Sequence, residues 1–270
     1  MWQQSRIFGI RNKAFGISLF IAIAAAAFPT RATSEQAVSR PNVAEQYLLA
    51  AANQDRAARG LPPLHRDPVL AQAAFYHARQ MAAHDKISHQ FPGEPDLSAR
   101  GARVGARFSL ITENVAEAPE STMIHELWMH SKGHRENLLD PNVDSVGISV
   151  VVHDHRFFAV EDFARTVKSL SFNEQETTVA SLLEQSGVQV DGKSISVEDA
   201  RRTCGMSTGY AGHRRPWFIM RYTAGGLSAL PSELQSRLNS GKYHEAAVGA
   251  CVSTDSGPFS AYNIAVLLYP

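Results

Sequence analysis

The sequence predicts an α/β protein built from two layered units, and three observations support this prediction. Segments with the 3.6-residue period of amphipathic helices alternate with segments of strand character. The first series closes with two apolar segments, residues 146–152 and 157–163, which flank a polar turn and predict a β-hairpin. A further series of helix and strand patterns follows. We therefore expect one unit over residues 42–165 and a second, smaller α/β unit over residues 166–270.

Composition limits the class of protein. Of the 270 residues, 44% are hydrophobic and 19% are charged, so the chain can bury a substantial core. Lys and Arg number 26, and Asp and Glu also number 26, so the formal net charge is zero. A nucleic-acid-binding surface needs a basic excess, and we expect no nucleic-acid partner. Two cysteines are too few for a disulfide-dense scaffold or a four-thiolate metal site.

Residues 1–32 have the pattern of a signal peptide. A basic start precedes an apolar, uncharged run over residues 14–28 and an acceptable cleavage site at 30–32. The run is shorter than the roughly 20 residues that span a bilayer. An uncleaved anchor is the alternative. We predict an exported protein, extracellular or periplasmic, with a flexible leader at 33–41 and no stable membrane span after cleavage.

The first unit begins with two predicted helices. Residues 43–59 have helical periodicity, and Gly60 ends the segment. Asp67 followed by Pro68 is a strong helix start, because an aspartate N-cap precedes a proline in the first helical position. We expect this second helix to continue to about His84, with one face in the core.

The rest of the first unit combines a loop, short helices and the hairpin. Residues 89–105 are rich in Gly, Pro and Arg and predict a loop with a short helix. Ser121 can cap the next helix, and a second short helix is expected after Gly133. The hairpin then closes the unit near Arg165.

The second unit has its own start signals and strands. Asn173 with Glu176, and Ser196 with Asp199, are spaced as capping boxes at helix starts. No internal repeat is visible in the sequence. A further helix is predicted at residues 231–239, and strands are predicted at residues 217–222, 245–252 and 262–269.

Cys204 and Cys251 both fall in the second unit. An exported protein can keep a disulfide, and we predict that these two residues form one. The alternative is a pair of buried free thiols. A bridge over so long a loop would stabilise the fold by roughly 4 kcal/mol on the chain-entropy account.

Four segments of the first unit form an ordered set of motifs. They are Asn-Gln-Asp-Arg at 53–56 with Gly60-Leu61; Ser88-His89; Thr-Glu-Asn-Val-Ala at 112–116; and Trp-Met-His-Ser-Lys-Gly-His-Arg-Glu-Asn-Leu-Leu at 128–139, continued by Val-Gly-Ile at 146–148 and Asp-Phe at 162–163. Over residues 42–165 this set resembles the CAP superfamily, also called the SCP or cysteine-rich secretory protein, antigen 5 and pathogenesis-related 1 domain. The bacterial branch is the most similar.

The resemblance implies a three-layer α-β-α sandwich with a concave cleft on one side. Members of the family typically place two His and two Glu in this cleft. By position, His89, Glu113 and His134 fill three of these places. Ser131 stands where many eukaryotic members have the second Glu, so a complete acid–base set is not expected. Thr112 replaces the usual Gly before Glu113, which changes the backbone freedom there.

Three uses of this cleft are open at this point. His89, Glu113 and His134 can form a hydrogen-bonded polar knot that holds the loops on the sheet. Alternatively, His89 and His134 can bind a divalent metal, with Zn²⁺ as the possible cofactor. In a metal-dependent hydrolase, Glu113 would be the candidate catalytic base. No Ser lies in a nucleophile elbow, so nucleophilic catalysis has little support.

Other polar residues near the motifs have simpler explanations. Arg100, Arg103 and Arg107 form a basic loop that is either a solvated face or a rim for an anionic ligand. His125 and His130 are five residues apart. On a helix their rings would diverge by roughly 140°, which does not fit the two-histidine pattern of metalloproteases.

We predict a binding or scaffold module of the cell envelope or extracellular space rather than an enzyme. Its partner would be a small ligand or an envelope component, held in the cleft of His89, Glu113, Ser131 and His134. The alternatives are a metal-dependent hydrolase that uses the same cleft and a lipid or sterol carrier, a role found in some relatives. The oligomeric state is left open.

Overall fold

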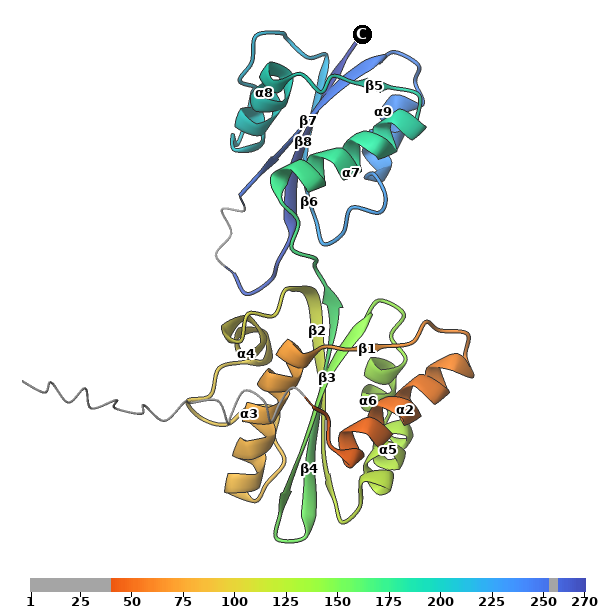
Figure 1. Cartoon of the computed structure of the whole chain (residues 1–270), viewed down its shortest axis with the longest axis vertical. Helices are drawn as coiled ribbons and strands as arrows, with labels where there is room; N and C mark the ends of the chain where they lie inside the picture. The colour runs from red at the N-terminus through yellow and green to blue at the C-terminus, as the bar shows by residue number, and fades with distance from the viewer. Residues whose placement is uncertain (1–39, 253–256) are drawn as a thin grey trace, which may run out of the picture.

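The computed structural model describes residues 40–252 and 257–270, and the predicted signal peptide lies outside these ranges. The described chain forms two α/β units, drawn one above the other in Figure 1, each with its own mixed sheet. This arrangement confirms the predicted fold class. Within the described ranges, no helix has both the length and the apolar character that crossing a bilayer requires.

The first unit has helices on both faces of a four-stranded sheet. In chain order its elements are α2 (Val43–Ala57), β1 (His65–Arg66), α3 (Pro68–His84), α4 (Leu97–Arg103), β2 (Phe108–Ala118), α5 (Ser121–His130), α6 (Lys132–Leu138), β3 (Ser145–His153) and β4 (Arg156–Thr166). The strand order is β1-β3-β4-β2, with β1 parallel to β3 and the other pairs antiparallel. Because α2 and α5 pack on one face and α3 on the other, this is a three-layer α-β-α sandwich (Figure 1).

Two local signals start the first helices. Asn42 and Glu45 form a capping box at the start of α2. Asp67 caps α3 and accepts from the backbone N–H groups of Val69 and Leu70, at 2.8 and 3.2 Å. The predicted Asp67-Pro68 start and the predicted end at His84 are therefore confirmed.

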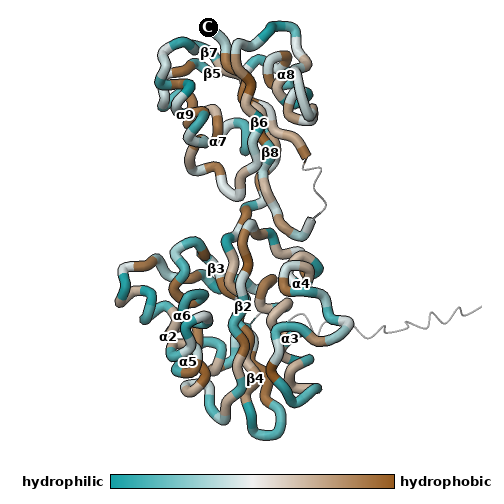
Figure 2. The backbone as a smooth tube through the Cα atoms, turned by 180° about the vertical axis from the view of Figure 1, so that it is seen from behind, coloured by the Kyte–Doolittle hydropathy of each residue, from teal (hydrophilic) through white to brown (hydrophobic). Residues whose placement is uncertain are grey.

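The second unit has the same kind of layering. In chain order its elements are α7 (Phe172–Gln185), β5 (Gln189–Val190), α8 (Ser194–Cys204), β6 (Phe218–Ala224), α9 (Ser232–Leu238), β7 (Glu245–Cys251) and β8 (Tyr262–Tyr269). The strand order is β5-β7-β8-β6, with β5 parallel to β7 and the other pairs antiparallel. α7 and α9 share one face, and α8 covers the other. In Figure 2 the hydrophobic colour follows the central strands of both units.

The two units repeat one topology, although no repeat is visible in the sequence. Apart from the extra α4 and α6, both run helix–strand–helix–strand–helix–strand–strand and give the same strand order. A glycine marks the same close approach in each. A Cβ at Gly147 on β3 would lie 2.2 Å from the Leu70 carbonyl carbon of α3, and one at Gly249 on β7 would lie 2.1 Å from Arg201 N of α8. The two units share their backbone packing, and few side chains are needed to specify that packing.

The disulfide prediction is confirmed. Cys204 and Cys251 are bonded to each other. The bond ties the last residue of α8 to the last residue of β7. It therefore fixes the C-terminal end of α8 against the sheet of the second unit.

The predicted capping boxes of the second unit need correction. The box that starts α7 is Ser171 with Glu174, two residues before the predicted Asn173 and Glu176. Both pairs satisfy the spacing rule, but Glu176 turns toward the sheet and accepts from Arg201 and from Ala250 N instead. Because the Glu176 carboxylate accepts hydrogen bonds from Arg201 and Ala250 N, it does not accept one from the first turn of the helix.

The second predicted box is also wrong. Lys193 precedes α8 without a side-chain cap. Ser196 donates to Asp191, and Asp199 accepts from the backbone N–H of His213. The two polar residues therefore hold the loops on either side of α8 rather than its first turn.

The two units contact each other through the start of β2 and the segment that leads into β8. The rings of Phe108 and Phe259 lie 5.5 Å apart in an edge-to-face contact. Ser260 N donates to the Phe108 carbonyl oxygen at 2.8 Å, and the Tyr262 hydroxyl donates to the Lys168 carbonyl oxygen at 2.6 Å. The first two contacts join β2 to the segment before β8, and the third ties the linker after β4 to the second unit.

Candidate functional site

The predicted site residues come from separate elements around β2. Glu113 lies on β2, at the edge of the sheet, and His89 lies in the loop after α3. His134 lies on α6, and Ser131 lies at the break between α5 and α6. The helix break therefore falls at Ser131, not at Gly133, and it separates His134 from α5.

His89 and Glu113 form the centre of the site. His89 Nδ1 lies 2.8 Å from Glu113 Oε1, while Arg100 donates to Glu113 Oε2. The His89 side chain is 62% exposed, whereas that of Glu113 is 2% exposed. A buried, paired carboxylate thus orients an exposed imidazole, whose Nε2 has no partner within the described part of the chain.

His77, Glu94 and Arg100 support this pair, and the sequence did not single them out for this role. His77 on α3 is fully buried; its Nδ1 lies 2.7 Å from Glu94, and its Nε2 lies 2.7 Å from the Ser88 carbonyl oxygen. His77 Nε2 also lies 3.8 Å from Glu113 Oε2. His77 therefore links α3, the loop that carries His89 and the Glu113 carboxylate.

Arg100 is buried, which corrects the alternative of a solvated basic face for this residue. Asp96 caps α4, and this short helix turns Arg100 inward, where its side chain is 5% exposed. Besides Glu113, it donates to the His89 carbonyl oxygen at 3.0 Å. Arg100 thus neutralises Glu113 and positions the His89 backbone. Arg103 and Arg107 remain exposed.

Two more carboxyl groups lie on β4 behind the site. Asp162 is opposite Glu113 in the β2–β4 pair, and its neighbour Glu161 faces the other side of the sheet. Burial, followed by the negative charge of Glu113, raises the pKa of Asp162 well above its usual range. Burial alone raises the pKa of Glu161 in the same direction. Neither carboxyl has a hydrogen-bond partner among the described residues, so both favour the neutral form.

His134 and Ser131 complete the predicted set with weaker contacts. The rings of His134 and His89 lie 6.5 Å apart, centre to centre. Ser131 makes backbone hydrogen bonds that end α5 and start α6. Asn137 of α6 donates to the Glu113 carbonyl oxygen at 3.1 Å, and the Trp128 indole of α5 donates to the Val115 carbonyl oxygen at 3.1 Å. These bonds hold both short helices against β2.

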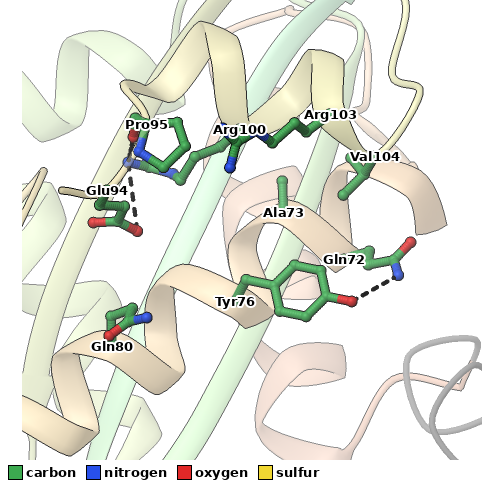
Figure 3. A pocket seen from close by; sticks show the side chains of 9 residues that line it. All are labelled: Gln72, Ala73, Tyr76, Gln80, Glu94, Pro95, Arg100, Arg103 and Val104. Atoms are coloured by element: carbon green, nitrogen blue, oxygen red, sulfur yellow. Dashed lines mark hydrogen bonds and ion pairs between the residues drawn. The ribbon is translucent and has the colours of Figure 1, made fainter.

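A hollow of about 610 Å³ lies next to the site, between α3 and α4 (Figure 3). Arg100 and Glu94 line it and so connect it to Glu113. Tyr76 and Gln72, which hydrogen-bond to each other at 3.2 Å, stand on α3, and Arg103 stands on α4. The lining combines apolar side chains with the charged side chains of Glu94, Arg100 and Arg103.

The donor set offers little to a tightly held metal ion. Both Glu113 oxygens are engaged, which leaves His89 Nε2 and the His134 ring as the available donors. Protein zinc sites use three or four such ligands. Across residues 40–252 and 257–270, no group of three or more His, Cys, Asp and Glu side chains could hold an ion.

The two histidines are expected to titrate on opposite sides of the usual value. The hydrogen bond that His89 donates to Glu113 raises the pKa of His89. Burial, followed by the nearby His89, lowers the pKa of His134. NMR of the ring protons should show His89 titrating above about 6.5 and His134 below it. The His89 contribution to stability is present below about pH 6.5 and lost as pH rises through its folded pKa. The His134 contribution has the opposite sign, because protonation below about pH 6.5 favours the unfolded chain.

A matched variant checks this assignment. In Glu113→Gln the pKa of His89 should fall, because the hydrogen bond that raises it is weakened. A His89 pKa that does not move would show that Glu113 does not control the ring.

Part of the chain is similar to known proteins. A profile of the CAP family, described as the Cysteine-rich secretory protein family, matches residues 49–163. The Bacillus subtilis uncharacterized protein YkwD is 29% identical over 122 residues, which are 44% of this chain and 47% of that protein. The chain thus spans about half the length of this curated relative. It also spans 36% of a second one, the uncharacterized membrane protein YlbC of Bacillus subtilis, at 27% identity over 126 residues and 45% of this chain.

One solved structure reaches 30% identity. An extracellular protein containing a SCP domain from Bacillus anthracis str. Ames matches 46% of this chain and 40% of that chain, with a TM-score of 0.41. The residues that the CAP profile matches include His89, Glu113, Ser131 and His134. Residues 49–163 therefore form a CAP-family segment that is similar to those of bacterial proteins.

Proposed function

We propose that this chain is an exported binding module of the cell envelope or extracellular space. Its cleft would bind a small polar ligand through the two imidazoles of His89 and His134. The observation that carries the proposal is the His89 side chain, which is 62% exposed yet held by a 2% exposed glutamate. Such support gives an exposed ring one orientation, which favours binding because little freedom is lost.

The opposite pKa shifts define the ligand chemistry. His89 favours the protonated form and can donate, whereas His134 favours the neutral form and can also accept. A hydroxyl or carboxyl group between the rings would satisfy both. Envelope polymers carry such groups, and an extracellular SCP-domain protein is among the relatives.

The hydrolase alternative has no observation in its favour. Glu113 would have to accept a proton, but both of its oxygens are already bonded and its side chain is buried. The lipid-carrier alternative needs an apolar groove, whereas the charged side chains of Glu94, Arg100 and Arg103 line the hollow beside the cleft. We therefore propose binding rather than catalysis or lipid transport.

The test uses insoluble cell-wall sacculi as the probe. The purified protein should co-sediment with them at pH 7, and the His89→Ala, His134→Ala double variant should lose most of this binding. His130→Ala is the matched control, because His130 is exposed and its ring contacts only the Glu126 carbonyl oxygen. Equal sedimentation of all three proteins would overturn the proposal.

Zinc calorimetry with elemental analysis on the same proteins tests the alternative that His89 and His134 bind a metal ion. We expect no stoichiometric zinc, because only two donors are available. One zinc ion per chain, lost in the double variant, would show that the cleft is a metal site instead.

A further inference from the structure

The repeated topology allows the two units to be compared position by position. Gly147 on β3 is opposite Asp162, and Asp162 is opposite Glu113 on β2. These pairings define the place of the cleft glutamate relative to the glycine that α3 approaches.

The corresponding strand pairings in the second unit lead from the glycine to an arginine. Gly249 on β7 is opposite Ala265, and Ala265 is opposite Arg221 on β6. β6 is an edge strand of its sheet, as β2 is. Arg221 therefore occupies the position that Glu113 occupies in the first unit.

The second unit also leaves this part of the sheet uncovered. α3 has 17 residues, and its second half covers the sheet with His77, Ala78 and Met81. α8 has 11 residues and ends at Cys204, where the disulfide holds it. Beyond that end lies a hollow of about 680 Å³, a size typical of small-molecule sites.

Arg221 lines this hollow as a fixed cation. Its Nε donates to the Thr203 carbonyl oxygen at 2.7 Å, and its Nη2 donates to the Gly209 carbonyl oxygen. Its Nη1 has no acceptor in the described residues, and none of their carboxylates lies within ion-pair distance of it. By contrast, Arg201 is paired with Glu176, and Arg214 with Glu245.

A second donor stands beside it. The Thr223 hydroxyl donates to Asn263 Oδ1 at 2.7 Å. Asn263 also lines the hollow, and its amide nitrogen remains available as a donor. Met206 and Phe259 add apolar wall to the same space. Two donors, one of them charged, next to apolar surface suit an anionic head group on an apolar body.

We propose that the second unit binds a small apolar carboxylate in this hollow, with Arg221 as the anchor and Asn263 as a further donor. The site goes beyond the proposed function of the cleft and does not depend on it. It lies at the equivalent place of the repeated fold, with the opposite charge.

Fluorine NMR on the purified protein tests the site with two probes of nearly equal shape. 4-Fluorobenzoate should bind and broaden, whereas the neutral 4-fluorobenzamide should bind at least about tenfold more weakly, because a charge-assisted hydrogen bond is lost. Equal binding of the two probes would overturn the proposal.

Two variants locate the binding. Arg221→Met should abolish benzoate binding. Thr223→Asp should do the same while leaving Arg221 in place, because its carboxylate would pair with the arginine from an exposed position on the same strand face. Arg237→Met is the control, since this exposed arginine stands on α9 across the sheet. Thermal unfolding confirms that each variant is folded. Benzoate binding that survives in Thr223→Asp would place the anion elsewhere and refute the site.

Discussion

Arg100→Met is expected to destabilise the first unit by about 3–5 kcal/mol, because it leaves the Glu113 carboxylate buried without its cationic partner. Arg100 is 5% exposed, and it also donates to the His89 carbonyl oxygen, so the loop that carries His89 should loosen as well. Urea unfolding at pH 7 measures the loss.

Arg103→Met is the control for that experiment. Arg103 lies on the same short helix but is exposed, so its replacement should change stability by no more than about 0.5 kcal/mol. If the two variants lost similar amounts, the buried ion pair would not be what holds this side of the cleft.

Gly147→Ala should be at least as damaging, at about 3 kcal/mol or more, because the added methyl group meets backbone rather than a flexible side chain. The nearest atoms would be the Leu70 carbonyl carbon at 2.2 Å and Ala71 N at 2.3 Å. The α3 helix would have to move away from β3, and His77 would move with it. Thermal unfolding measures the loss, and the His89 ring-proton signals report whether the site is disturbed.

Gly133→Ala is the matched control. No atom outside the neighbouring residues lies within 4 Å of the added carbon, and the position is helical. Alanine should therefore stabilise α6 by up to about 1 kcal/mol. A Gly147→Ala protein that unfolds like the parent would show that α3 and β3 tolerate a wider spacing than the structure has.

Local signals predicted the elements well. The Asp67-Pro68 start, the hairpin and the last strand each depend on residues close together in the sequence, and each was found where expected. The disulfide followed from an even count of cysteines and the expected export. Such features are governed by backbone preferences and by nearby side chains, which a sequence states directly.

The support of the site depends on contacts that a sequence does not state. Arg100 lies in a loop rich in Gly and Pro, where arginines are usually solvated. Only the turn made by α4 brings it to Glu113. His77 looks like one more residue on an apolar helix face, and its partner Glu94 is 17 residues away. The family motifs predicted which residues lie together in the cleft, but they did not predict that Arg100 pairs with Glu113.

The repeat was hidden for a related reason. Its markers are two glycines and a strand order, and neither constrains much of the surrounding sequence. Arg221 replaces Glu113, and the helix beside it is shorter, so no motif of the first unit recurs in the second. Topology can be kept by packing alone while side-chain chemistry changes.

The hydrogen bonds that hold α5 and α6 against β2 also affect how the protein behaves among other chains. β2 is a long edge strand, and a free edge invites pairing with strands of other molecules. Asn137 and the Trp128 indole occupy the outward carbonyl oxygens of Glu113 and Val115. The motif segment that builds the cleft therefore also protects this edge from pairing with other chains. A variant that loses the hydrogen bond of Asn137 or Trp128 would expose a strand edge that promotes aggregation.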